Sequence, residues 1–131
     1  MSPEKIVLAV EAVGDPGWRW LAGMLALHPK PWTWKNSEGG IETRVDERLM
    51  EDGVAEGALA FGGWLPDFDD TATVGCLLAL VRAAWKDEYL VVLWRDGGWT
   101  WIERPRCREQ KKHPRFRTEL EALVAALRGA P

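Results

Sequence analysis

Residues 64–85, WLPDFDDTATVGCLLALVRAAW, join a cluster of aspartates to a strongly periodic apolar run. The run predicts an amphipathic helix over residues 71–86, because its apolar positions recur at the i, i+3, i+4 and i+7 spacing of one helix face. That predicted stripe consists of Val74, Leu77, Leu78, Val81 and Trp85. A helix of this kind must bury its apolar face, so the rest of the chain has to supply a partner layer.

Three aspartates, Asp67, Asp69 and Asp70, stand directly before this helix. A helix start favours a short side-chain acceptor at the N-cap and negative charge near the positive end of the helix dipole. Asp70 is in the position for that cap. A calcium loop would need acids at alternate positions, a central glycine and a distal glutamate, and the segment has no such distal ligand. We therefore interpret the cluster as a helix start, with no metal expected.

Two further helices are indicated by their ends. Ser2 and Pro3 are typical of an N-cap and first helical position, and Gly14 can provide a left-handed C-cap, which predicts a helix over 3–13. The apolar run at 6–10 would also suit a strand. Near the other terminus, the capping box of Thr118 and Glu121 predicts a helix over 119–128. Its predicted apolar stripe consists of Leu120, Leu123, Val124 and Leu127.

Alternating Trp-x-Trp pairs indicate strands, because residues i and i+2 share one face of a strand. On this basis we expect strands near 18–27 and 31–35. The alternation in IETRVDERL predicts another strand near 41–49, residues 51–57 should form a loop, and residues 58–65 should form a short strand or extended segment. Residues 89–94 and 99–103 should form a hairpin around Asp96-Gly97-Gly98. The elements together predict an α+β fold in a single domain, 1–131: a mainly antiparallel sheet covered by two or three helices, an αβ-sandwich.

The composition is that of a globular protein, with 47% hydrophobic and 28% charged residues. No apolar run is long enough to span a membrane, and the first residues lack the basic region of a signal peptide. The two cysteines, Cys76 and Cys107, fit free thiols better than a disulfide. These features favour a cytoplasmic protein that does not contact membranes.

The charges are segregated along the chain. Residues 104–117 hold seven Lys or Arg against one Glu, whereas residues 38–70 hold ten Asp or Glu against two Arg. Patches of opposite sign can steer two different partners toward a protein. They can equally attract each other and contribute little.

No motif for catalysis or cofactor binding is found. His28 and His113 each precede a proline and lack a second ligand at zinc spacing, so we assign them to turns. Cys76 falls in the apolar stripe, and Cys107, between arginines, is the more reactive thiol of the two. The glycine pairs lack a phosphate-loop lysine, and no Gly-x-Ser-x-Gly elbow is present. The sequence predicts no enzyme, no cofactor and no metal site.

Nine tryptophans in 131 residues are unusual. Trp85 and Trp94 are expected in the core. The three Trp-x-Trp pairs are too many for one small sheet to bury, so at least one pair should be partly exposed. Exposed tryptophans are frequent anchors of protein–protein interfaces.

Residues 64–131 resemble the phage ABA-sandwich family, small proteins of phages and prophages whose function is unknown. The resemblance rests on Leu65, Pro66, Asp67, Asp70, Cys76 and the helix that follows Thr118. It implies a phage origin and hence the cytoplasm of a bacterial host, and it implies no catalytic residues. The basic segment 104–117 departs from the family pattern.

Two functions remain open. The first is a non-catalytic, phage-derived interaction protein, for example an anti-defence inhibitor, that binds a host or phage protein; a second copy of the chain is another candidate partner. Its candidate contact residues are Trp18, Trp20, Trp32, Trp34, Asp46 and Glu47. The alternative is nucleic-acid binding through phosphate contacts of the basic segment. Those residues are Arg104, Arg106, Arg108, Lys111, Lys112, Arg115 and Arg117.

Overall fold

The computed structural model describes residues 1–35, 41–48, 63–104 and 112–131, with the backbone alone for 29–35 and 41–48. The described residues form three helices and five strands, which confirms the α+β class. The strands are antiparallel but lie in two sheets, of order β2-β1-β3 and β4-β5. In chain order the elements are α1 (Pro3–Val13), β1 (Leu25–Lys35), β2 (Ile41–Arg48), β3 (Leu65–Pro66), α3 (Thr71–Trp85), β4 (Val91–Arg95), β5 (Gly98–Ile102) and α4 (Glu119–Arg128).

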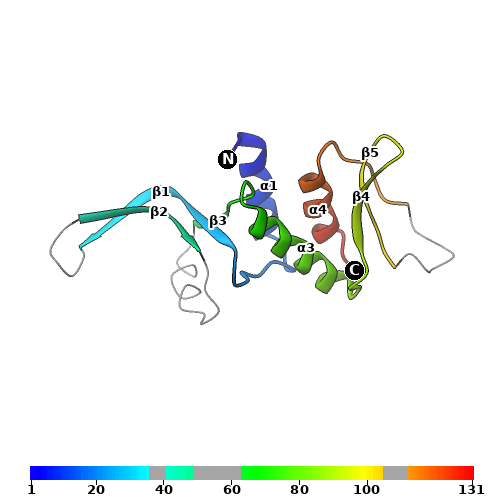
Figure 1. Cartoon of the computed structure of the whole chain (residues 1–131), viewed down its shortest axis with the longest axis horizontal. Coiled ribbons are helices and arrows are strands. Elements are labelled where there is room, and N and C mark those ends of the chain that lie inside the picture. Colours follow the sequence, from blue (N-terminus) through cyan, green and yellow to red (C-terminus); the bar gives the residue numbers. More distant parts are fainter. Residues whose placement is uncertain (36–40, 49–62, 105–111) are drawn as a thin grey trace.

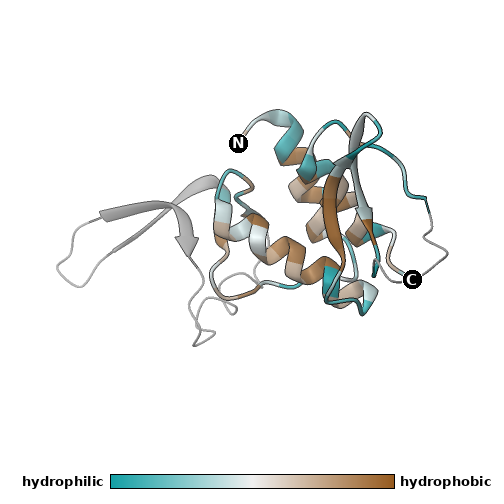
Figure 2. Ribbon diagram, turned by 45° about the vertical axis from the view of Figure 1, so that its right-hand side comes forward, coloured by the Kyte–Doolittle hydropathy of each residue, from teal (hydrophilic) through white to brown (hydrophobic). Residues whose placement is uncertain are grey.

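Helix α4 is the centre of the fold (Figure 1), where it contacts α1 and α3 on one side and the β4–β5 hairpin on the other. The apolar segments of these elements come together around it (Figure 2). Strands β1 and β2 form a two-stranded arm that extends away from the helices. The arm joins the body where β1 pairs with β3, at Ala26 and Leu27.

The helix ends form largely as their sequences predict. The hydroxyl of Ser2 accepts a hydrogen bond from the Lys5 backbone N–H at 3.3 Å, and that of Thr118 accepts one from Glu121 N–H at 3.1 Å. These bonds confirm both N-caps. The expected left-handed C-cap is wrong, because Gly14 has φ −74° and α1 ends in a right-handed turn.

Asp70 is the N-cap of α3, as predicted. One of its carboxylate oxygens accepts hydrogen bonds from the backbone N–H of Thr73 at 3.0 Å and from the Thr73 hydroxyl at 2.8 Å. The same hydroxyl accepts a bond from the Leu25 N–H at 2.8 Å, so the cap also connects α3 to the start of β1. Asp69 lies on the surface and forms an ion pair with Lys5 on α1 at 2.6 Å. The aspartates therefore organise contacts around one helix end.

Replacing Asp70 with alanine should lower the free energy of unfolding by about 1–2 kcal/mol, because the cap and the Thr73 hydroxyl lose their acceptor. Asp70→Asn keeps an acceptor oxygen and should have little effect. Urea unfolding of both variants measures the difference. A divalent cation that raised the melting temperature of the native protein, but not that of Asp70→Asn, would contradict the capping role and indicate a metal ligand.

The buried face of α3 differs from the predicted stripe. Its fully buried positions are Thr73, Leu77, Leu80 and Val81, whereas Leu78 is half-buried. The prediction that Leu78 is in the core is therefore wrong, because the buried face of α3 is rotated by part of a helix turn from the predicted stripe. The reason is tertiary: the Thr73 hydroxyl binds β1, which turns that side of α3 inward. The predicted stripe of α4 is confirmed, since Leu120, Leu123, Val124 and Leu127 are all buried.

The first predicted strand begins late. Residues 18–24 do not form a strand, because Gly23 turns the chain with φ +94° before β1 begins at Leu25. Strand β1 then runs through the predicted 31–35 region, with a shift of register between Leu27 and Trp32. Two prolines lie in that interval, and proline has no N–H to donate to the ladder. β2 confirms the strand expected from 41; the expected loop at 51–57 and residues 58–62 lie outside the described residues.

The hairpin of β4 and β5 is confirmed. Its two-residue turn places Asp96 at φ +51° and Gly97 at φ +85°, the left-handed pair that a tight hairpin requires. Trp94, expected in the core, is 58% exposed. It pairs with Trp99 next to the turn, whereas the neighbouring pair on the same face, Val92 and Trp101, packs against the core.

Candidate functional site

The candidate protein-binding residues lie in two places. Trp18 and Trp20 follow α1 and are half-buried against the core, with their rings edge to face at 5.4 Å. The Trp18 indole N–H is buried and has no acceptor among the described residues. This pair therefore contributes mainly to packing, with part of its surface left accessible.

The remaining four candidates lie on the arm. In the register of β1 and β2, Trp32 pairs with Arg44 and Trp34 with Glu42, toward the end of the arm that is distant from β3. Asp46 and Glu47 are at the opposite end, paired with Leu27 and Ala26. The structure gives backbone positions for all four and does not describe the side chains of Trp32, Trp34, Asp46 and Glu47.

Part of the basic segment is described. The Arg104 backbone N–H donates to the Asp87 carboxylate at 2.6 Å, and its guanidinium lies 5.7 Å from the centre of the exposed Tyr89 ring. Arg117 is exposed just before α4. Arg106, Arg108 and Lys111 lie outside the described residues.

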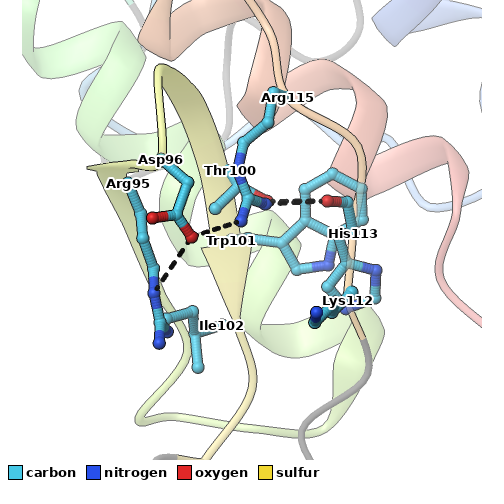
Figure 3. Close-up of a pocket in the computed structure, with 8 residues that line it drawn as sticks. All are labelled: Arg95, Asp96, Thr100, Trp101, Ile102, Lys112, His113 and Arg115. Atoms are coloured by element: carbon cyan, nitrogen blue, oxygen red, sulfur yellow. Dashed lines mark hydrogen bonds and ion pairs between the residues drawn. The ribbon is translucent and has the colours of Figure 1, made fainter.

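Two basic residues of this segment, Lys112 and Arg115, meet the β4–β5 hairpin at a groove (Figure 3). The groove has a volume of about 120 Å³. We call it the hairpin groove. It is lined by Arg95, Asp96, Thr100, Trp101, Ile102, Lys112, His113 and Arg115.

Three cations and one carboxylate line the hairpin groove. Arg115 donates to the backbone carbonyl of His113 at 2.9 Å and approaches Asp96 at 3.4 Å. The Nε of Arg95 is 3.9 Å from the same Asp96 oxygen. Among the described residues, Lys112 has no ion-pair partner, so positive charge exceeds negative charge in the groove.

His113 holds the basic segment against the hairpin. Its ring stacks on Trp101 at 4.2 Å, and its Nε2 is 2.5 Å from a Glu103 carboxylate oxygen. Phe116 continues the attachment, since it exchanges backbone hydrogen bonds of 2.8 Å with Trp99. His113 is thus a packed anchor and not a simple turn residue. The other histidine, His28, lies in strand β1, so the expectation of a turn is wrong for it as well.

Of the eight groove residues, sequence reasoning identified only Lys112 and Arg115 as candidates and missed the charged pair Arg95 and Asp96. Arg95 and Asp96 belong to the hairpin and lie 16–20 positions before Lys112 and Arg115, which they meet in the groove. The turn signal at Asp96 is visible in the sequence, but that signal says nothing of which segment packs beside the turn. The Glu103–His113 pair likewise depends on the path of the intervening chain.

The titration of two acidic groups follows from their surroundings. The Cys76 thiol is half-buried in α3, and desolvation, assisted by the nearby Asp70 charge, raises its pKa. Cys76 is therefore a weaker nucleophile than an ordinary thiol at neutral pH. The Lys5 ammonium, by its hydrogen bond, lowers the pKa of exposed Asp69. Cys107 is outside the described residues.

Within the described ranges, no three His, Cys, Asp or Glu side chains gather as metal ligands. None of the helices found there is both long and apolar enough to cross a membrane. Comparison with protein-family models, with curated proteins and with solved structures gives no match.

Proposed function

We propose that this chain is a phage-derived, non-catalytic interaction protein that binds a basic surface of a host protein through its β1–β2 arm. An inhibitor of a host defence protein is one concrete form of this function. Such an inhibitor acts by occupying a surface, so it requires no catalytic residues. The phage origin rests on the resemblance of residues 64–131 to the phage ABA-sandwich family.

The observation that carries the proposal is the arm itself. Its two strands pair with each other and extend from the helical body, and β2 is an edge strand of its sheet. A two-stranded ribbon is marginally stable in water, and an open strand edge can accept a further strand or surface. A partner that covered the arm would supply the missing contacts.

Charge favours a basic partner. Strand β2 of the arm lies within residues 38–70, a part of the sequence that contains ten acidic residues and two arginines, whereas β1 lies before it. Such an excess attracts a positively charged surface and can imitate the phosphate backbone of a nucleic acid. The tryptophans of β1 would add apolar anchors at the same place.

A second candidate function is nucleic-acid binding through the basic segment. The observation that favours it is the meeting of Lys112 and Arg115 with Arg95 in the hairpin groove. Phosphate groups are the natural partners of such arginines.

The test is capture of a partner from bacterial host lysate by the immobilised protein, followed by titration of the purified partner. Replacing Trp32 and Trp34 together with alanine should weaken binding by about 2 kcal/mol or more, as at an interface hot spot. The matched control is Trp94→Ala, which removes an exposed tryptophan from the β4–β5 hairpin, outside the arm, and should leave the affinity unchanged.

A third variant separates the two candidate functions. Neutralising Arg106, Arg108, Lys111 and Lys112 together should leave a complex made by the arm largely intact. If instead the protein binds duplex DNA or RNA with steep salt dependence, and this variant loses that binding while no protein partner is recovered, the arm proposal is overturned.

A further inference from the structure

The hairpin groove has more positive charge than its own carboxylate neutralises. Three cations, Arg95, Lys112 and Arg115, line it together with one acid, Asp96. A guanidinium has five N–H donors, and the contacts that Arg95 and Arg115 make with Asp96 and the His113 carbonyl use only a few of them. Among the described residues, the groove therefore presents cationic donors with room to bind a further anion.

The contacts of Asp96 with the two arginines are loose. Its oxygen is 3.4 Å from Arg115 and 3.9 Å from Arg95, whereas a strong charged hydrogen bond between N and O measures about 2.7–2.9 Å. The Asp96 side chain is 76% exposed. Its place is set by the tight turn, which holds its backbone at φ +51°. An exposed pair of this kind contributes little, so a better acceptor can replace it at low cost.

Arg115 is oriented before any ligand arrives. One terminal nitrogen donates to the His113 carbonyl at 2.9 Å, and the Arg115 side chain is only 30% exposed. His113 is itself held by its stacking on Trp101. Because the guanidinium already has a fixed position, binding of a ligand costs the Arg115 side chain little conformational entropy.

The size of the groove limits the ligand. A volume of about 120 Å³ has room for several water molecules, and hence for the oxygens of one tetrahedral oxyanion. A terminal phosphate carries about −1.5 to −2 charges at neutral pH and offers three acceptor oxygens to a cluster of cations.

We infer that the hairpin groove binds a single phosphoryl group, and that Asp96 acts as an internal competitor for Arg95 and Arg115. The terminal phosphate of a nucleic acid is the favoured source, because two further exposed cations, Arg104 and Arg117, belong to the same basic segment as Lys112 and Arg115. This inference specifies the ligand for the second candidate function and does not depend on docking by the arm.

The test is isothermal titration calorimetry at low ionic strength with four probes: inorganic phosphate, a phosphoserine peptide, a short single-stranded DNA with a 5′-phosphate, and the same DNA with a 5′-hydroxyl. The 5′-phosphorylated DNA should bind most tightly. Asp96→Asn should bind it about fivefold more tightly, because the competing charge is removed while asparagine still tolerates the left-handed turn. Arg115→Gln should bind it about tenfold more weakly or worse.

Arg19→Gln is the matched control, since it removes an exposed arginine outside the groove and makes the same change in net charge. It should leave the affinity unchanged. Because Arg95→Gln tests the groove from the hairpin side, the result does not depend on whether Arg115→Gln folds.

Equal affinity for inorganic phosphate and the 5′-phosphorylated DNA would support the groove and identify free phosphate as its ligand. Equal affinity for the two DNAs, unchanged in Asp96→Asn, would overturn the inference while leaving general nucleic-acid binding by the basic segment intact. A phosphoserine peptide that binds more tightly than either DNA would overturn the assignment to nucleic acid. Failure of every probe with both the native protein and Asp96→Asn would exclude the site.

Discussion

Replacing Trp101 with alanine should lower the free energy of unfolding by about 3–5 kcal/mol, the largest effect that we expect of a single substitution in this protein. Trp101 is 5% exposed and connects two parts of the fold. On one side its ring lies 6.2 Å from that of Trp85 on α3, and on the other it stacks on His113 at 4.2 Å. Truncation leaves a cavity between these two contacts and removes the ring on which His113 stacks.

Two variants make the Trp101 experiment specific. Trp94→Ala removes the same side chain from the same hairpin, but at a position that is 58% exposed, and should cost less than about 1 kcal/mol. Trp101→Phe keeps an aromatic ring and removes an indole N–H that has no acceptor among the described residues, so its cost should be well below that of alanine. Chemical denaturation measures all three. Equal losses for Trp101→Ala and Trp94→Ala would show that the hairpin packs differently.

The second large effect concerns two adjacent leucines of α3. Leu77 is fully buried, whereas Leu78 is half-buried at the edge of the core. Leu77→Ala should lower the free energy of unfolding by about 2–5 kcal/mol, and Leu78→Ala by less than half as much. The change in helix propensity is the same in both variants, so the difference between them reflects burial alone.

Urea unfolding of the two leucine variants checks this orientation. Leu123→Ala on α4 should resemble Leu77→Ala, because Leu123 is 1% exposed. If Leu78→Ala proved as costly as Leu77→Ala, the stripe predicted from the sequence would describe α3 better than a buried face made of Thr73, Leu77, Leu80 and Val81.

The helix starts and the hairpin were predictable because they depend on short-range chemistry. Asp70 and Thr118 cap the helices that follow them with bonds to residues three positions away. The turn at Asp96 and Gly97 needs two left-handed residues in succession, and those residue types adopt that conformation readily. Each of these features is complete within four or five residues of chain.

For the hairpin groove, the sequence predicted the basic residues but not the hairpin residues that they meet. The charge of residues 104–117 is visible in the sequence and indicates an anion as a partner of that segment. The hairpin groove also needs Arg95 and Asp96, which no local pattern connects to Lys112 or Arg115. Their meeting depends on His113 stacking against Trp101, a contact between segments that the fold brings together.

By itself, then, the sequence determined the α+β class, the three helices of the described residues with their N-caps, and the tight hairpin, because local hydrogen bonds and periodicity suffice for these. The tertiary structure alone decided which face of α3 is buried, why Trp94 is exposed and Trp101 is not, and how the strands divide between two sheets. Those outcomes depend on which elements pack around α4. Packing joins residues that are distant in the chain, and their side chains carry no local signal of the partners they will meet.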